Sequence, residues 1–213
     1  PVDSLDPERF VSAEAGARWQ GDRLSAELAA YYTWIEDMIV RAPTGEVIDG
    51  LDEVTKKNAG NGYVAGAELT LGYQVAEDWH VRLMGSWMDG EVDAYPTSDP
   101  STKRDSISRL MPLTGQAALR WQPAGEAFWL EAEVDAAEKA NRLSADDERD
   151  TQRIPPGGTP GYAVLTLRGG VTVLDALQLT LALENATDED YRIHGSGVNE
   201  PGRNLVVQAE WTF

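Results

Sequence analysis

The sequence predicts an all-β protein whose antiparallel strands form part of a transmembrane β-barrel. Three observations support this fold class: segments of alternating apolar and polar residues, connections that alternate between short and long, and aromatic residues near the ends of the apolar faces. No stretch approaches the roughly 18 apolar residues of a transmembrane helix. The mean hydropathy of -0.39 fits a barrel, because only every second residue of a barrel strand faces lipid.

The alternation recurs in about nine segments, each close to the ten residues with which a tilted strand crosses a bilayer. It is clearest in residues 177–184, where Leu177, Leu179, Leu181 and Leu183 share one face. An odd number of antiparallel strands leaves the first and last strands parallel to each other, so they do not close a barrel alone. The expected strands are residues 11–19, 24–34, 65–73, 79–87, 113–121, 128–136, 163–173, 177–184 and 205–213.

The connections between these strands fall into two classes that strictly take turns. We expect tight links at Gln20–Arg23, Ala76–Asp78, Pro123–Ala127 and Leu174–Ala176. We expect long polar loops at Glu36–Lys57, Val92–Met111, Lys139–Pro160 and Asp188–Pro201. Outer-membrane barrels have this asymmetry, with brief periplasmic turns and longer extracellular loops.

Aromatic residues are expected to form girdles where the apolar band meets water. One girdle lies beside the short links, and a second is expected near the long loops. The first comprises Trp19, Tyr73, Trp79, Trp121, Phe128, Trp211 and Phe213, and the second Tyr32, Trp34, Trp87 and Tyr162. The opposite faces of the strands mix acidic and basic side chains, as suits a wet lumen. The alternative is a soluble β-sandwich or lipocalin-like barrel, in which the apolar face packs inward.

Composition excludes several classes of function. Lys and Arg number 18 against 36 Asp and Glu, giving a formal charge of -18, so nucleic acid is not an expected partner. The chain has no cysteine and only two histidines, so we expect no thiolate or multi-histidine metal site and no cofactor. His194-Gly195-Ser196-Gly197 is not a nucleophile elbow, because neither the flanking glycine pattern nor the strand-to-helix context is present. We expect no enzyme and no catalytic residue.

Three motifs in order along the chain resemble those of TonB-dependent outer-membrane receptors. A Pro-Glu strand entry opens the chain, an Asn- and Gly-rich strand start follows, and an Asn-x-x-Asp-x-x-Tyr segment precedes a Pro-Gly-Arg start of the last strand. The resemblance covers nearly the whole chain. It is carried by Pro7, Glu8, Glu14, Gly16, Asn58, Gly62, Gly66, Glu68, Asn185, Asp188, Tyr191, Pro201, Gly202, Arg203 and the terminal Phe213.

The resemblance implies a fold, a location and a function. It implies that residues 1–213 are a single incomplete domain, the carboxy-terminal portion of a 22-stranded barrel whose amino-terminal plug domain is absent from this chain. It implies a Gram-negative outer membrane, with lipid and lipopolysaccharide as surroundings, and coupling to TonB through the missing amino-terminal region. The implied activity is active uptake of a scarce metal chelate or other small molecule, a ferric siderophore, haem or cobalamin. A passive porin-type barrel is the alternative function.

The expected ligand contacts lie in the last long loop and in the lumen. Tyr191, Arg192, His194 and Asn199 are placed to face the extracellular mouth, and Arg168 the lumen. The alternative, favoured for the loop, is that glycines only shape it and that Arg192 and Arg203 pair with its carboxylates. Two further weak signals are a lone lumenal histidine, His80, and an acidic run that suits either Ca²⁺ or a solvated loop. The acidic run comprises Asp146, Asp147, Glu148 and Asp150.

Overall fold

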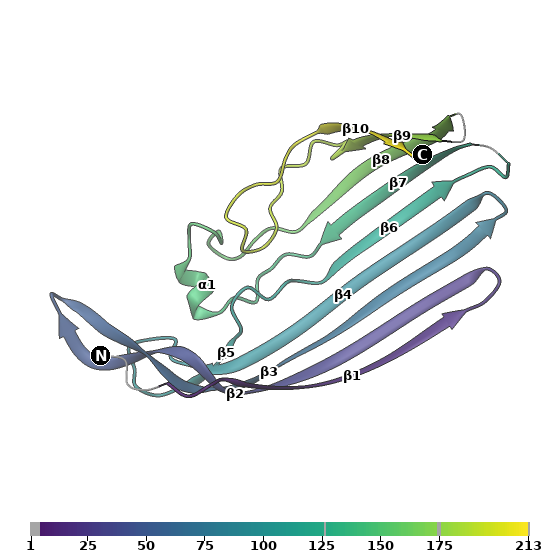
Figure 1. Ribbon diagram of the computed structural model, residues 1–213. Helices are drawn as coiled ribbons and strands as arrows, with labels where there is room; N and C mark the ends of the chain where they lie inside the picture. Colours follow the sequence, from purple (N-terminus) through teal and green to yellow (C-terminus); the bar gives the residue numbers. More distant parts are fainter. Residues whose placement is uncertain (1–4, 126, 174–175, 213) are drawn as a thin grey trace.

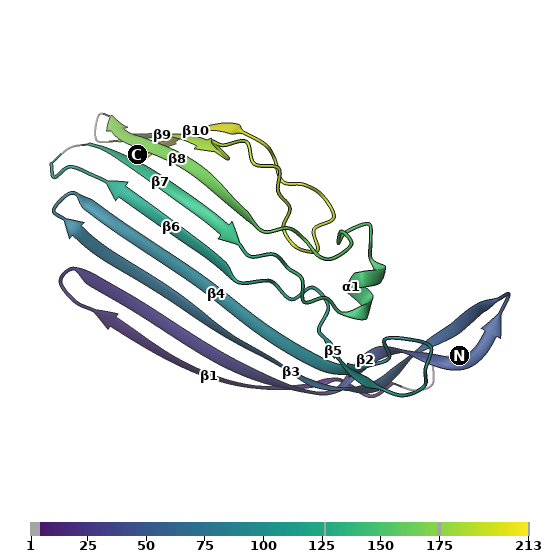
Figure 2. The ribbon, with the colours of Figure 1, turned by 180° about the vertical axis from the view of Figure 1, so that it is seen from behind.

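The protein forms one curved antiparallel β-sheet in a computed structural model that describes residues 5–125, 127–173 and 176–212. Figures 1 and 2 show the sheet as an open arc, with β1 and β10 at opposite edges. The sheet order is β1-β2-β3-β4-β6-β7-β8-β9-β10, and β5 pairs with the end of β4. The elements are β1 Arg9–Gln20, β2 Leu24–Ile48, β3 Leu51–Ala76, β4 Trp79–Ala94, β5 Lys103–Ser106, β6 Thr114–Trp121, β7 Phe128–Ala137, α1 Ala145–Arg149, β8 Tyr162–Val173, β9 Leu177–Glu184 and β10 Asn204–Trp211.

The strand predictions are confirmed in order and in pairing, since each of the nine expected segments overlaps one strand of the sheet. Two short elements were not predicted: β5, which extends the sheet beside β4, and the helix α1. Phe213 lies outside the described residues, as do Leu174 and Asp175 in the expected link at Leu174–Ala176.

One expected long loop is wrong. The segment 36–57 is not a polar loop, because β2 and β3 continue as a paired hairpin up to Ile48 and Leu51. Asp49 and Gly50 make the two-residue turn with φ of 51° and 81°, the left-handed pair that suits the twist of a hairpin. Register shifts after Ile35 mark where this extension bends away from the main sheet (Figure 1). The other long connections remain at the same end, which we call the long-loop end.

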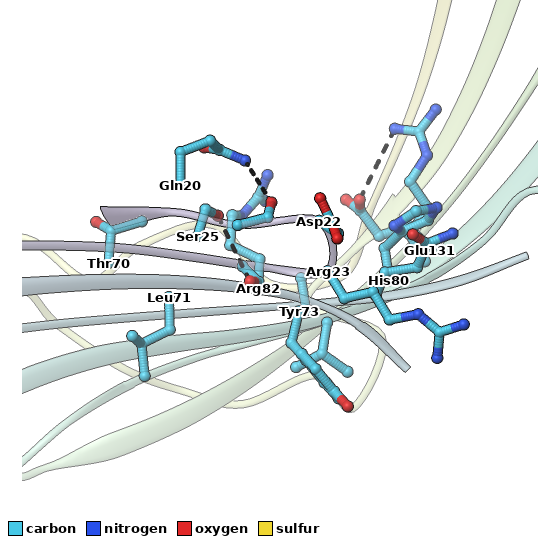
Figure 3. A pocket seen from close by; sticks show the side chains of 16 residues that line it. Gln20, Asp22, Arg23, Ser25, Thr70, Leu71, Tyr73, His80, Arg82 and Glu131 are labelled. Carbon is cyan, nitrogen blue, oxygen red and sulfur yellow. Dashed lines mark hydrogen bonds and ion pairs between the residues drawn. The ribbon is translucent and has the colours of Figure 1, made fainter. Parts of the chain in front are cut away.

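The register sorts side chains into two faces as the alternation predicts. Val81 lies opposite Leu119, and Glu131 lies opposite Arg168, so the apolar residues of neighbouring strands share the apolar face. Figure 3 shows the same sorting close by, with Thr70 and Leu71 on opposite sides of the strands. The other face we call the polar face; it carries His80, Arg82, Met84, Gln116, Arg120, Glu131, Glu133, Asp135, Tyr162, Thr166 and Arg168.

Burial is inverted relative to a soluble protein. The large aliphatic and aromatic side chains of the apolar face are exposed, while buried strand residues such as Ala118, Glu133 and Thr166 lie on the polar face. Side chains converge on the concave side of a curved sheet, so the polar face is the crowded, concave one. A soluble domain buries its leucines and tryptophans. The sheet is a single layer with an uncovered apolar face, whereas a β-sandwich needs two packed sheets. The β-sandwich alternative is therefore excluded. Among the described residues, no helix is long and apolar enough to cross a membrane.

Several of the residues expected in the aromatic girdles contact one another on the apolar face. Near the short links Trp121 lies 6.1 Å from Trp79 and 5.6 Å from Phe128, measured between ring centroids. Tyr32 lies 4.7 Å from Trp34 on the other side of the apolar band. Tyr162 was assigned wrongly, because it shares the parity of Thr166 and Arg168 and so lies on the polar face; the alternation already required this.

The connections at the long-loop end pack into a small core of their own. Ile154, Thr159 and Asp147 are the largest fully buried side chains among the described residues, and all three belong to the connection between β7 and β8. An isolated bridge joins Ala140 to Thr159. We call the packed segments 107–113, 138–161 and 185–203 the loop cap.

The two faces predict opposite outcomes for the same substitution at adjacent positions. Leu83 and Met84 are 42% and 46% exposed, yet they lie on the apolar and polar faces respectively. We expect Leu83→Arg to destabilise the full barrel by about 2–4 kcal/mol, as for an arginine facing lipid near the bilayer midplane. Met84→Arg, which places the guanidinium in the lumen, should cost less than about 1 kcal/mol.

The measurement is urea unfolding of the full-length protein in lipid bilayers, followed by the heat-dependent gel shift of folded barrels. Equal losses for Leu83→Arg and Met84→Arg would contradict the assignment of the two faces.

Candidate functional site

The wall of the polar face is held by a network of ion pairs across four strands. The carboxylate of Glu133 accepts from Arg82 at 3.0 Å and from Arg168 at 2.6 Å. Arg168 also reaches Glu131 at 3.2 Å, which lies 4.0 Å from Arg120. Glu133 is only 3% exposed, and burying its charge would be costly without partners. The two guanidinium groups that face it offset this cost. Acid and base alternate along the wall.

This network holds the Arg168 side chain against the wall. Both of its terminal nitrogens are engaged by Glu131 and Glu133 within the wall. Its predicted contact with a ligand stays a prediction, and the structure assigns it first to the ion-pair network. Arg120 has an additional partner, since its Cζ lies 4.1 Å from the centre of the Trp129 ring, in cation–π geometry.

A pocket of about 450 Å³ lies on the polar face toward the short turns (Figure 3). It combines polar side chains of both signs, with Asp22 and Glu131 beside Arg23, Arg82 and His80. His80 thus lies on the lumenal wall, as expected.

A second pocket of about 340 Å³ lies farther toward the long-loop end and has a different electrostatic character. Its lining includes the carboxylates of Glu68 and Asp135, the thioether of Met84 and the ring of Tyr162, but no Lys, Arg or His among the described residues. Asp135 accepts a hydrogen bond from Gln116 at 2.8 Å, so its charge meets a neutral donor. The lumenal wall is therefore mixed in sign near the short turns and acidic near the loops.

Three of the predicted ligand residues meet in the loop cap. Tyr191, Arg192 and Asn199 line a pocket of about 180 Å³ together with Asp190, Pro155, Pro160 and Gly161. Arg192 donates to the Asn199 side chain at 2.9 Å, and Asn199 donates to Asp190 at 2.7 Å. The expected pairing of Arg192 and Arg203 with loop carboxylates is not what forms, because Arg203 donates its side chain to the carbonyl of Ala186.

Tyr191 connects this loop pocket to the lumenal wall. Its ring lies 4.6 Å from that of Tyr162, which lines the acidic pocket below. Burial, with a smaller contribution from the carboxylate of Glu200, raises the pKa of Tyr191. Its hydroxyl therefore stays protonated and can donate a hydrogen bond. The two tilted rings, 48° apart in plane, bring the loop pocket and the acidic pocket into contact.

His194 does not join the other predicted residues. It is only 7% exposed, and its Nδ1 lies 2.9 Å from the Thr159 hydroxyl. It packs inside the loop cap and does not line the pocket of Tyr191. The expectation that it faces the mouth is therefore wrong, because the turn at Gly195 directs it into the cap.

The acidic run at 146–150 is solvated at Asp146 and Glu148, whereas Asp147 is buried and Asp150 is partly buried. Asp147 is 1% exposed and forms a capping box with Ser144 at the start of α1. Burial alone would raise the pKa of Asp147, but hydrogen bonds from Ser108, Ser144 and the Arg109 backbone outweigh it and lower the pKa. Asp150 accepts from Arg153 and Arg109. No group of three or more metal-ligating side chains occurs in the described ranges.

The capping box and the wall network were missed from sequence. The Ser144-x-x-Asp147 spacing was a readable signal for a helix start, whereas the partners of Glu133 come from strands far apart in the chain.

Comparisons with known proteins identify the family. The family described as "TonB dependent receptor-like, beta-barrel" matches residues 1–186. The chain belongs to the TonB-dependent receptor β-barrel family. Barrels of this family lie in the outer membrane, and its members are receptors and transporters. A comparison with curated proteins gives no match.

Solved structures share the fold of this receptor barrel. The copper transporter OprC is 19% identical with a TM-score of 0.77, and the match covers 99% of this chain and 32% of OprC. The FrpB iron transporter from Neisseria meningitidis (F3-3 variant) is 18% identical with a TM-score of 0.76, covering 100% and 32%. The ferric-catecholate import receptor Fiu from E. coli K12 is 21% identical with a TM-score of 0.68, covering 98% and 28%. The chain thus spans about a third of the length of these proteins.

The wall network predicts unequal consequences for its two glutamates. Glu133→Gln removes the charge that both Arg82 and Arg168 share, and we expect a loss of about 1–3 kcal/mol. This is less than the ~3–5 kcal/mol for breaking a fully buried pair, because both arginines are partly exposed. Glu131→Gln should cost less, since its contacts are longer.

Urea unfolding of the full receptor measures both losses under the same conditions. Identical midpoints for Glu133→Gln and the unmodified receptor would show that the network does not stabilise the wall.

Proposed function

We propose that this chain forms the carboxy-terminal part of the barrel of a receptor that imports a scarce small molecule by TonB-dependent active transport. The observation that carries the proposal is the family match over residues 1–186. The lumenal wall and the loop pocket supply the chemistry, because Tyr191 of the loop pocket contacts Tyr162 of the acidic pocket on that wall.

The rest of the receptor would supply the strands that pair with the two open edges of this sheet. β1 and β10 do not pair with each other, so further strands are needed to satisfy their outer backbone groups within a bilayer. The exposed apolar face would contact lipid and lipopolysaccharide of a Gram-negative outer membrane. A plug domain would occupy the lumen and couple to TonB through an amino-terminal segment outside this chain.

The ligand is proposed to be a metal chelate such as a ferric siderophore, haem or cobalamin. The matched structures include transporters of copper and iron and a ferric-catecholate import receptor, which supports this class. The loop pocket offers a guanidinium at Arg192, an amide at Asn199 and the protonated hydroxyl of Tyr191. Such donors and an aromatic surface suit a ligand that bears oxygen atoms on an organic frame.

An uptake assay tests the proposal. Cells that produce the full-length receptor are supplied with radioactively labelled ferric siderophores, haem and cobalamin, with and without a functional TonB. Uptake of one of these probes that disappears without TonB is expected. Uptake that is independent of TonB, together with steady ion conduction by the receptor in planar bilayers, would instead favour the passive porin-type barrel.

Tyr191 is expected to matter for ligand binding. Tyr191→Ala removes the ring that joins the loop pocket to Tyr162, and we expect binding of the transported probe to weaken about tenfold, equivalent to ~1.4 kcal/mol. Tyr32→Ala, on the exposed apolar face, is the control and should bind normally. Binding to the purified receptor is measured by fluorescence quenching; equal affinity of both variants would remove Tyr191 from the site.

A further inference from the structure

The loop cap contains a buried histidine that lacks one hydrogen-bond partner. His194 is 7% exposed, its Nδ1 pairs with the Thr159 hydroxyl at 2.9 Å, and its Nε2 is buried without a partner. If Nδ1 carries the proton and donates to Thr159, Nε2 presents only a lone pair. Protonating Nε2 would then bury an N–H and a positive charge that no acceptor meets.

His194 lies where three segments of the cap meet. It sits at the second position of a turn closed by the hydrogen bond from Ser196 to Ile193, and Gly195 follows with φ of 79°. A side chain at Gly195 would lie 3.2 Å from the Arg109 side chain, so this turn packs closely on the β5–β6 connection. Thr159 belongs to the β7–β8 connection and is bridged to Ala140.

Burial opposes the protonation of His194 and outweighs the charged groups around it. Burial lowers the pKa of His194, the Arg109 guanidinium lowers it further, and only the Asp147 carboxylate acts in the other direction. Asp147 is already the acceptor for Ser108, Ser144 and the Arg109 backbone. Arg109 and Arg153 share Asp150. Thr159, on the remaining element, carries no charge.

We propose that His194 is a pH-sensitive latch of the loop cap. In its neutral form it holds the 185–203 segment against Thr159, and its protonation releases that segment and opens the loop pocket. The latch goes beyond the proposed transport function, since it concerns the loops alone and requires no particular ligand.

The direction of the effect follows from proton linkage. The closed cap disfavours the charged form of His194, so the open cap binds more protons between the lowered pKa and the ordinary value near 6.5. The closed state is fully favoured above that value, and the open population should rise by up to about tenfold for each pH unit below it. Asp147 stays ionised in this range, because its own pKa is lowered from 3.8.

Electron–electron distance measurements on the full receptor test the latch. Spin labels are placed at Gln152→Cys and Val198→Cys, both exposed, in the β7–β8 and β9–β10 connections. The distance distribution is expected to lengthen and broaden from about pH 7.5 to about pH 5. His194→Gln, which keeps a donor toward Thr159 and does not titrate, should hold the high-pH distribution throughout. The control His80→Gln, on the lumenal wall, should respond like the unmodified receptor.

A second measurement needs no substitution at His194. Deuterium exchange at the ring carbon of each histidine, followed by mass spectrometry, reports its pKa and its exposure in the unmodified receptor. Slow exchange and a midpoint below the ordinary histidine value near 6.5 are expected for His194. An unchanged distance distribution at low pH, a His194→Gln variant that still responds, or a His194 that titrates like an exposed histidine would each overturn the latch.

Discussion

The backbone hydrogen bonds of the antiparallel ladder constrain everything else in this protein. In a bilayer no water satisfies an unpaired N–H or C=O group, so each strand must pair along its length with a neighbour. Strand pairing then fixes which residues share a face, because side chains alternate along every strand. The apolar residues gather on one side and the charged residues on the other. The inverted burial, with Leu83 exposed and Glu133 enclosed, is a direct consequence.

The charge of the polar face changes from the short turns to the loops. Toward the short turns the wall is neutralised by ion pairs centred on Glu133 and Arg168. Toward the loops Glu68 and Asp135 lie in a pocket whose described lining contains no basic residue, and Tyr162 of that pocket contacts Tyr191 of the loop pocket. The polar face is therefore acidic and aromatic toward the loops and ion-paired toward the short turns.

The loops are more organised than their polar composition indicates. Asp147 joins α1 to the β5–β6 connection through hydrogen bonds with Ser108 and Arg109, and His194 joins the last loop to Thr159. These buried polar contacts hold together segments that no strand pairing connects. The hairpin of β2 and β3 is organised differently, since its backbone ladder continues to the turn at Asp49 and Gly50. Buried polar contacts and a continued backbone ladder thus both shape the long-loop end of the sheet.

The sequence by itself determined the strands, their order and their two faces, because alternation is a local property that each segment carries alone. Even Tyr162 was readable from its parity with Arg168. The hairpin at 36–57 also carried a local signal, the Asp49-Gly50 turn. Only the tertiary structure decided that His194 turns inward onto Thr159 and that Glu133 serves two arginines. These two features depend on contacts between residues distant in the chain, for which local periodicity carries no information.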